Sequence, residues 1–263
     1  WAKLTNRGYE LSLSTVNVKT KDFRWVMDFN LAHNKSKINR LNVRDNSYEP
    51  SREGYSVGAV FSLKTAGLDE NGLQMFYNKQ GEKVSFNDFF GLEYGYMMGG
   101  LIPFLKSNLS AEEYRNLFTY EGTTEPKFTG GWINRFYYKN FDLTVSASFV
   151  LDQTVQEQPF YNPVQTSPGQ NYSRRMSQIW SPDNTSGKYP RIMGTYTEGE
   201  EKWAYQWLGM LDPGNSYRKY DYWFKKMSYM RINSIRLGYT FPERLLGYRS
   251  SRAIRSTAST SSG

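Results

Sequence analysis

The sequence offers few residue combinations that could perform a chemical reaction. Its only histidine, His33, has no second histidine and no cysteine in the chain with which to share a metal ion. The glutamate pairs at 112–113 and 200–201 have the residue type of glycosidase carboxylates, but the first suits a helix N-terminus and the second a solvated loop. The glycine pairs at 99–100 and 130–131 lack the strand-to-helix context of a phosphate-binding loop. We therefore expect no enzyme activity, no metal site and no cofactor.

Aromatic side chains are the better candidates for a functional role, as binding residues. Exposed rings stack on sugar or peptide faces and lose little entropy on binding. The aromatic-rich insertion at residues 152–219 supplies the candidates for contact with a substrate or a partner protein, which are Trp180, Trp203, Tyr205 and Trp207. In the alternative interpretation, the rings pack the insertion on itself or form an aromatic girdle. The alternative is favoured for residues 220–223, which lead into a predicted strand, whereas neither interpretation is favoured for residues 203–207.

The composition restricts both the fold class and the partners. Aromatic residues make up 17% of the 263 residues, yet the mean hydropathy is −0.69, which suits amphipathic strands better than a helical bundle. No apolar run approaches the ~20 residues of a membrane-spanning helix, so strands would have to make any crossing. The formal charge of +8 comes from scattered Lys and Arg without a nucleic-acid-binding motif. We therefore expect no nucleic acid partner. Anionic lipid headgroups or an anionic solute are the expected partners of this charge instead.

The clearest element is residues 130–151, which the sequence predicts to be two strands joined by a tight turn at Lys139-Asn140. In the second strand the odd-numbered residues from Phe141 to Leu151 are apolar, and the even-numbered residues from Asp142 to Ser148 are polar. Because successive side chains of a strand point to opposite faces, one face is apolar and the other hydrophilic. A strand of about ten residues with this pattern suits either the wall of a soluble sandwich or a membrane crossing.

The same alternation recurs along the chain and defines its organisation. Further strands are predicted within residues 9–18, 23–32, 55–64 and 229–241, the last with a bulge near Asn233. Helix signals lie at 111–118, where Ser110 has capping-box spacing, and at 172–180. The polar faces carry mainly small polar residues, which suits a wet, confined lumen. The alternative is a soluble β-sandwich that acts as a carbohydrate-binding module.

Residues 247–263 change in composition and are predicted to be a disordered or non-native tail.

Five stretches resemble a known family when they are taken in order. The first has Asn6, Gly8 and Glu10 before two strands, with Trp25 and Asn30 in the second strand. This spacing closely resembles a stretch of SusC/RagA-type TonB-dependent outer-membrane transporters. Four further stretches are similar to motifs of that family: REGYSVGAVFSLKTAGLDENG at 52–72, PKFTGGWINRFYYKNFDLTVSASF at 126–149, WSPDNTSGKYPR at 180–191 and FKKMSYMRINSIRLGYTFP at 224–242. Ser56 stands where the family commonly has proline, and the tail lacks the family's final strands.

The resemblance implies a fold and a function for the chain. The fold would be all-β, a partial transmembrane antiparallel β-barrel with long extracellular loops that contain short helices. Residues 1–246 would be the C-terminal part of the barrel, with a plug domain and earlier strands before Trp1, and residues 247–263 would depart from the family. The whole protein would import oligosaccharides or oligopeptides across a Gram-negative outer membrane, in contact with its lipid. A SusD-like surface lipoprotein would serve as a lid, and TonB would act through the plug. Short turns such as 19–21 would be periplasmic, which places the insertion on the extracellular side.

Overall fold

The structure is a computed structural model that describes residues 2–42, 48–97, 102–163, 166, 169–192, 216–242 and 255–261. The chain divides into two compact units, each built from segments that lie far apart in the sequence. The sheet unit comprises residues 4–37, 124–153 and 226–263, and the loop unit comprises residues 1–3, 38–123 and 154–225.

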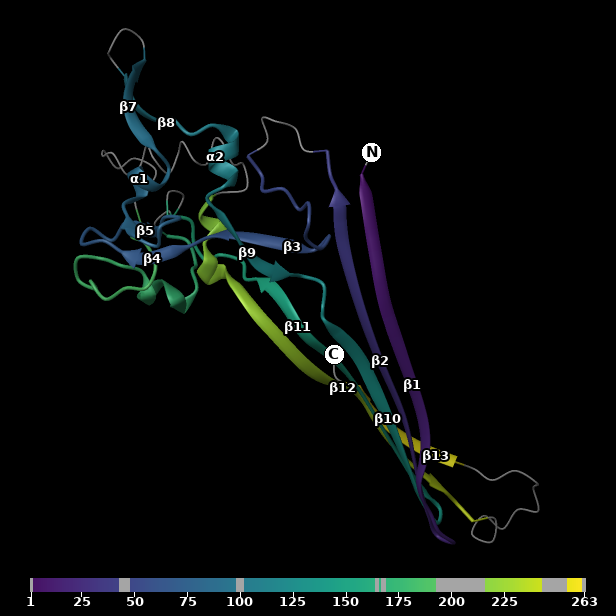
Figure 1. The fold of residues 1–263 in the computed structure, drawn as a ribbon. Helices are drawn as coiled ribbons and strands as arrows, with labels where there is room; N and C mark the ends of the chain where they lie inside the picture. Colours follow the sequence, from purple (N-terminus) through teal and green to yellow (C-terminus); the bar gives the residue numbers. More distant parts are fainter. Residues whose placement is uncertain are drawn as a thin grey trace. The chain divides into compact units, whose positions relative to one another are not determined.

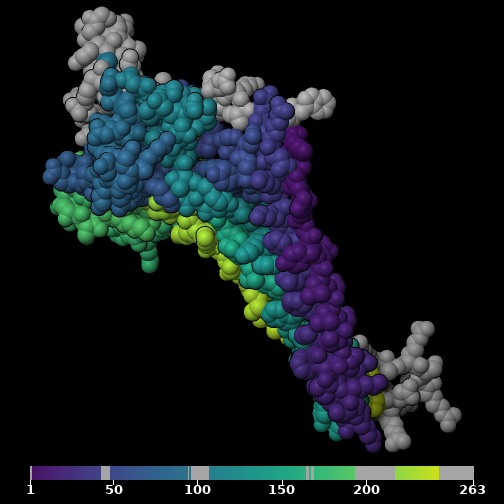
Figure 2. Space-filling model, viewed as in Figure 1, coloured from purple at the N-terminus to yellow at the C-terminus, as the bar shows by residue number. Residues whose placement is uncertain are grey.

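The sheet unit contains a six-stranded sheet in the order β1-β2-β10-β11-β12-β13 (Figure 1). Its strands are β1 (Lys3–Lys19), β2 (Phe23–Arg40), β10 (Phe128–Tyr138), β11 (Phe141–Gln156), β12 (Phe224–Thr240) and β13 (Arg255–Ser261). In Figure 2, β1 (purple) runs along one edge of the sheet unit. The strands predicted within residues 9–18, 23–32, 130–151 and 229–241 are therefore present, and β1 and β2 are longer than the alternation of their side chains indicates.

The register of β10 between β2 and β11 sorts the side chains onto two faces. Trp132 pairs with Phe29 on one side and Ala147 on the other, and Phe136 pairs with Trp25 and Leu143. Directly paired residues point to the same face, so these side chains share an apolar face, and their neighbours in sequence form the opposite polar face. The apolar face is uncovered: Leu11 is 51% exposed, Phe141 50% and Leu237 51%.

One polar side chain lies on the apolar face and is satisfied there. Asn134 pairs in register with Met27 and Val145. The indole Nε1 of Trp25 donates a hydrogen bond to the side-chain oxygen of Asn134 at 2.9 Å. An unpaired amide would be costly to bury in an apolar medium, so this hydrogen bond makes Asn134 compatible with its apolar surroundings.

The short turns lie together at one end of the sheet. Lys139 has a positive φ of 49°, and its amide N–H donates to the Asp22 carbonyl at 2.9 Å. Asn140 exchanges hydrogen bonds with Thr240 at the end of β12. The predicted turn at Lys139-Asn140 is confirmed. The long connections that follow β2 and β11 and precede β12 consequently leave the sheet at its other end.

The bulge predicted near Asn233 is supported by two hydrogen bonds. Ser146 and Ser148 lie two residues apart on the polar face of β11, and they contact Ser234 and Asn233, which are adjacent on β12. Two consecutive side chains on one face of a strand require an extra residue in the ladder. Met230 and Ile232 can therefore share a face with Ile235 and Leu237 despite their different parity.

The loop unit is built from short elements in small sheets. It contains β3 (Ala59–Leu63) paired with β9 (Phe118–Thr123), a three-stranded sheet of β4 (Thr65–Leu68), β5 (Gln74–Tyr77) and β6 (Lys83–Val84), and β7 (Leu92–Met97) paired with β8 (Ile102–Ser107). Two helices, α1 (Phe86–Phe89) and α2 (Ala111–Arg115), and the 3₁₀ turns η2 (Arg174–Gln178), η3 (Ser216–Lys219) and η4 (Asp221–Trp223) complete it. Among the described residues, no helix is long and apolar enough to cross a membrane.

Aromatic rings form most of the core of the loop unit. Phe76 stacks on Phe89 with ring centroids 4.3 Å apart, and Trp223 stacks on Tyr189 at 5.4 Å. The buried cluster comprises Leu63, Phe76, Phe86, Phe89, Phe90, Tyr114, Tyr161, Ile179, Tyr189, Tyr217, Tyr220 and Trp223. For residues 220 and 223 the packing alternative is the one observed, because both rings are buried.

Several local predictions differ from the structure. The helix predicted for residues 111–118 is α2, which has the predicted capping box of Ser110 and Glu113 but ends at Arg115, before β9 begins at Phe118. The helix predicted for 172–180 is only the 3₁₀ turn η2, because the Trp180 amide N–H bonds to the Tyr189 carbonyl instead of continuing the helix. Residues 55–58 lie ahead of β3 without strand structure. In the tail, residues 255–261 form β13, which pairs with β12, and the disordered or non-native character of residues 247–263 stays a prediction.

The two-faced sheet predicts different costs for the same substitution on its two faces. In a lipid bilayer, Leu143→Arg should lower the free energy of unfolding by about 2–4 kcal/mol, because it places a charge on the apolar face near the bilayer midplane. Thr144→Arg, the matched control on the polar face, should cost much less. Denaturant titration in lipid measures both, and equal costs would contradict a membrane-facing apolar surface.

A second prediction concerns acid sensitivity in the loop unit. Glu157 accepts hydrogen bonds from Lys225 and Arg175, and its amide N–H donates to the Trp223 carbonyl at 2.7 Å. The hydrogen bond from Lys225 lowers the pKa of the Glu157 carboxyl; partial burial opposes this shift, and the bond from Arg175 adds to it. A lowered carboxyl pKa stabilises the folded state above the unfolded pKa of about 4.3, and this stabilisation is lost as the pH falls through the folded pKa.

We therefore expect amide hydrogen-exchange protection around residue 157, corrected for intrinsic rates, to be constant between about pH 7 and pH 5 and to fall at more acid pH. Glu157→Gln should reduce the protection at neutral pH and flatten this acid dependence. Glu112→Gln, which removes an exposed carboxylate from α2, is the control and should keep the wild-type profile. Identical acid profiles for Glu157→Gln and the wild type would show that the Glu157 contacts do not hold the insertion.

Candidate functional site

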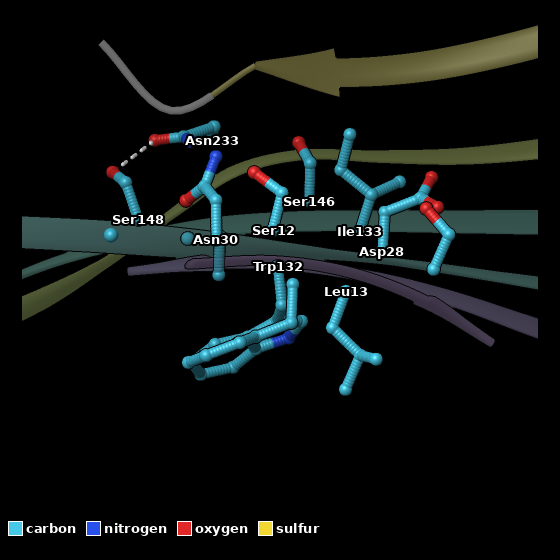
Figure 3. A pocket seen from close by; sticks show the side chains of 14 residues that line it. Ser12, Leu13, Asp28, Asn30, Trp132, Ile133, Ser146, Ser148 and Asn233 are labelled. Atoms are coloured by element: carbon cyan, nitrogen blue, oxygen red, sulfur yellow. Dashed lines mark hydrogen bonds between the residues drawn. The ribbon is translucent and has the colours of Figure 1, made fainter. Parts of the chain in front are cut away.

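A concavity of about 460 Å³ lies on the polar face of the sheet unit. In Figure 3, Ser12, Asn30, Ser146, Ser148 and Asn233 point to one side of the strands, while Leu13 and Trp132 point to the other. The residues that line it come from β1, β2, β10, β11 and β12, and include Ser12, Ser14, Asp28, Asn30, Gly131, Ile133, Ser146, Ser148 and Asn233. We call this feature the polar concavity.

The polar concavity forms because small residues meet across adjacent strands. Gly131 of β10 pairs with Asn30 of β2 and with Ser148 of β11. A Cβ atom at Gly131 would lie 2.7 Å from the Ala147 carbonyl oxygen, so the close approach of the strands at this point requires glycine. With no side chain at the centre and short serines on β11, the surface is hollow between Asn30 and Asn233.

Hydroxyl and amide groups dominate the chemistry of the polar concavity. Ser146 and Ser234 share a hydrogen bond of 2.8 Å, and the Ser148 hydroxyl donates to the side-chain oxygen of Asn233 at 3.1 Å. The Asn30 amide has no partner among the described residues, so it is available to a ligand. Such groups donate to and accept from hydroxyl-rich or amide-rich molecules. The Ser14 hydroxyl donates to the Asp28 carboxylate, which is also paired with Arg135, and the remaining hydroxyl and amide groups offer donors and acceptors for binding.

The charges at the polar concavity cancel. Asp28 and Arg135 form an ion pair across β2 and β10 with side chains 36% and 33% exposed. A pair with this exposure contributes little to stability, so its main effect is to leave no uncompensated charge on this surface. The polar concavity therefore suits a neutral polar ligand.

The sequence suggests that His33 is a rim or turn residue at the end of a strand, but it lies within β2, where its contacts are structural. Its ring lies between Tyr9 and Phe128, with centroids 5.0 and 5.1 Å away, and its Nδ1 is 2.6 Å from the Lys127 carbonyl oxygen. Across the described parts of the chain, no three His, Cys, Asp or Glu residues gather as metal ligands would.

Trp180, the described member of the candidate aromatic set, is 8% exposed in the loop unit. A Cβ atom at Gly72 would lie 2.3 Å from the Trp180 ring, and the Arg191 guanidinium lies 5.6 Å from the ring centroid. Trp180 also lines a concavity of about 320 Å³ with Met176, Pro182, Asn184, Arg191 and Ile192. Trp203, Tyr205 and Trp207 lie outside the described residues, so a binding role for this set stays a prediction.

The polar concavity was not among the sites predicted from the sequence. On the sequence alone, the glycine pair at 130–131 lacks the strand-to-helix context of a phosphate-binding loop and does not indicate a site. The signal that could have found the site was glycine in a strand whose neighbours present Asn30 and Ser148, because glycine within a strand marks a close approach or an open surface. Using that signal required the register, which sequence patterns did not supply.

Comparison with known proteins gives a consistent result. No protein-family profile matches the chain. The chain is 26% identical over 271 residues to TonB-dependent receptor P3 of Formosa agariphila, covering 96% of this chain and 23% of that protein. It resembles the solved RagAB peptide transporter with 16% identity and a TM-score of 0.64, covering 99% of this chain and 26% of that one. The RagAB peptide importer in its closed-closed state gives 18% identity and a TM-score of 0.64, covering 97% of this chain and 25% of that one.

The chain thus spans about a quarter of the length of the relatives that it matches. The structural similarity confirms the predicted fold class, because it extends over nearly all of this chain. Together, the receptor and the RagAB structures confirm the resemblance of this chain to part of a SusC/RagA-type TonB-dependent transporter.

Proposed function

We propose that this chain forms part of the wall and the extracellular loops of an outer-membrane β-barrel that imports oligosaccharides or oligopeptides in a TonB-dependent manner. The observation that supports this proposal most directly is the two-faced sheet, with one apolar and one polar face. Large apolar side chains on β1 and β12 are between 46% and 59% exposed, namely Tyr9, Leu11, Leu13, Met230, Ile232 and Leu237. A contiguous apolar surface of this kind marks contact with a membrane or a partner, and the alternation with a hydrophilic face is typical of barrel strands.

The barrel proposal accounts for the sheet better than the alternative of a soluble β-sandwich. In a sandwich a second sheet covers the apolar face at about 10 Å. Within the sheet unit, the described strands belong to a single six-stranded sheet. The polar concavity then lines a wet lumen, where its hydroxyl and amide groups contact cargo or the plug.

The arrangement of the connections supports an orientation for the chain. Barrels of this kind carry short turns on the periplasmic side and long loops outside. The turns before Phe23 and at Lys139-Asn140 are short and lie at one end of the sheet, where Asn140 also contacts Thr240. The connections that form the loop unit leave from the other end, which is extracellular in this proposal. The insertion at 152–219 then meets incoming cargo or a lid.

The partners follow from the same proposal. A SusD-like surface lipoprotein would cover the loops, and TonB would act through a plug domain that belongs to the whole protein and lies outside residues 1–246. The similarity to the RagAB peptide transporter and to a TonB-dependent receptor supports these assignments. We propose oligosaccharides or oligopeptides as the cargo, because the hydroxyl and amide groups of the polar concavity can hydrogen-bond with both.

Cell fractionation combined with an uptake assay tests the proposed function. The protein that carries this chain should be found in the outer-membrane fraction, and uptake of its cargo should be lost when TonB is deleted. A protein recovered in the soluble fraction, or uptake that does not depend on TonB, would contradict the proposal.

The aromatic candidates of the insertion provide a separate prediction. Replacing Trp203, Tyr205 and Trp207 together by alanine should leave barrel assembly intact and weaken binding of lid or cargo by about 2 kcal/mol, or about thirtyfold, if the rings form a buried contact cluster. Tyr172→Ala, elsewhere in the insertion, should leave affinity unchanged. Affinities for the lid and for the cargo are measured on purified complexes. Unchanged binding of both would mean that the rings only pack the insertion.

A further inference from the structure

The loop unit contains a second recess, of about 320 Å³, whose lining is cationic and aromatic. Arg52 precedes β3, Arg218 and Lys219 belong to η3, and Glu49 is the only acidic side chain in the lining. Three cationic side chains against one carboxylate leave an excess of two positive charges at this recess. We call it the cationic recess, and it differs in this respect from the neutral polar concavity of the sheet unit.

The backbone of the cationic recess is held in place while its arginine side chains stay accessible. The Gln156 side-chain amide donates to the Arg218 carbonyl at 2.7 Å, which fixes η3 against the end of β11. The guanidinium of Arg218 is exposed and has no partner among the described residues. Arg52 is also exposed, and its guanidinium donates one long hydrogen bond, of 3.4 Å, to the Val57 carbonyl. Most donor groups of both arginines are therefore left for a ligand.

Aromatic rings form apolar walls beside these charges. Phe61, Phe118 and Phe224 line the cationic recess and are half-buried. Phe61 is held by edge-on contacts with Tyr55 and Tyr120, with centroids 5.2 and 5.8 Å away, and the Lys219 ammonium lies 5.4 Å from the centre of the Phe118 ring. Apolar walls lower the local dielectric and so strengthen a charge-assisted hydrogen bond at the guanidinium groups.

We propose that the cationic recess binds a carboxylate group of the imported cargo, with Arg52 and Arg218 as the carboxylate ligands and Phe61 and Phe118 as packing surfaces for the adjoining residue. Guanidinium groups match the planar, two-oxygen geometry of a carboxylate and bind it bidentately. A recess of this size accommodates one or two units of a chain. The identification of the ligand as cargo rests on the proposed import function, whereas carboxylate binding itself does not.

The carboxylate has two sources that fit this chemistry, and paired probes distinguish them. Isothermal titration with the purified full-length protein in detergent uses tetra-alanine with a free or an amidated C-terminus, and tri-galacturonate or its methyl ester. At least one carboxylate probe should bind about tenfold more tightly than its neutral partner. Preference within the peptide pair alone identifies a peptide terminus, and preference within the sugar pair alone identifies a uronate. Preference in both pairs identifies the carboxylate itself as the recognised group.

Substitutions then place the binding at the cationic recess. The double variant Arg52→Gln with Arg218→Gln should lose about tenfold or more in affinity for the carboxylate probe and keep its weak affinity for the neutral one. Arg174→Gln, which removes an exposed arginine elsewhere in the loop unit, should bind as the wild type does. Arg218→Lys keeps the charge and should lose less affinity than Arg218→Gln, which separates recognition from a folding defect.

The inference is overturned if neutral and carboxylate probes bind equally, if none of the four binds, or if the double variant binds like the wild type. TonB-dependent uptake that persists alongside any of these outcomes would remove the cationic recess as a cargo site and leave the proposed function standing. Conversely, carboxylate binding by a protein that is absent from the outer membrane would retain the site and contradict the import function.

Discussion

The antiparallel register of β10 between its two neighbours is the constraint on which the rest of the sheet unit depends. Trp132 lies beside Phe29 and Ala147, and Gly131 beside Asn30 and Ser148. Because side chains alternate with a period of two, a slip of one residue would exchange the two faces of a strand completely. Correct register therefore produces the apolar face, the satisfied Asn134 and the polar concavity together. It also explains glycine at position 131, where strand contact leaves no room for a Cβ atom.

The loop unit is stabilised by packing of aromatic side chains rather than by strand register. Its sheets are short, and its core is made mainly of rings, with Phe76 against Phe89 and Trp223 against Tyr189. Large rings bury much apolar area per residue, which allows a unit of short elements to form a core. Glu157 links η2 to the start of β12 through Arg175 and Lys225. The same arrangement leaves Arg52 and Arg218 of the cationic recess exposed at the surface of the loop unit, outside its aromatic core.

Much of the sheet unit could be predicted from the sequence because its information is local. The hairpin at residues 130–151 follows from the alternation, and its turn lies at Lys139-Asn140 as predicted, with Lys139 rather than Asn140 taking the positive φ. The length of β2 could not be predicted in the same way, because its later residues Lys35 to Arg40 do not alternate although the strand continues. Ladder hydrogen bonds continue a strand regardless of side-chain pattern. The 3₁₀ turn η2 replaced a predicted helix for a non-local reason, the pairing of Trp180 with Tyr189.

The candidate sites were harder to predict than the fold. Burial of Trp180 depends on Gly72, more than a hundred residues earlier in the chain, and the polar concavity depends on residues from five strands. Both follow from tertiary pairing that a sequence pattern does not contain. The cationic recess likewise combines Arg52 and Arg218 from distant segments. The sequence therefore identifies the polar and aromatic residues that could form a site, and only the structure shows which of them share a surface.

The central claim is that the two faces of the sheet meet different media, and spin-label accessibility along β11 tests it most directly. The chain contains no native cysteine, so single cysteines introduced in turn at residues 143–148 carry a nitroxide label without background labelling. In the full-length protein reconstituted in lipid, labels at odd-numbered positions should collide with oxygen, which concentrates in the bilayer. Labels at even-numbered positions should collide with a water-soluble nickel reagent. Uniform accessibility along the strand, or the opposite alternation, would contradict the account.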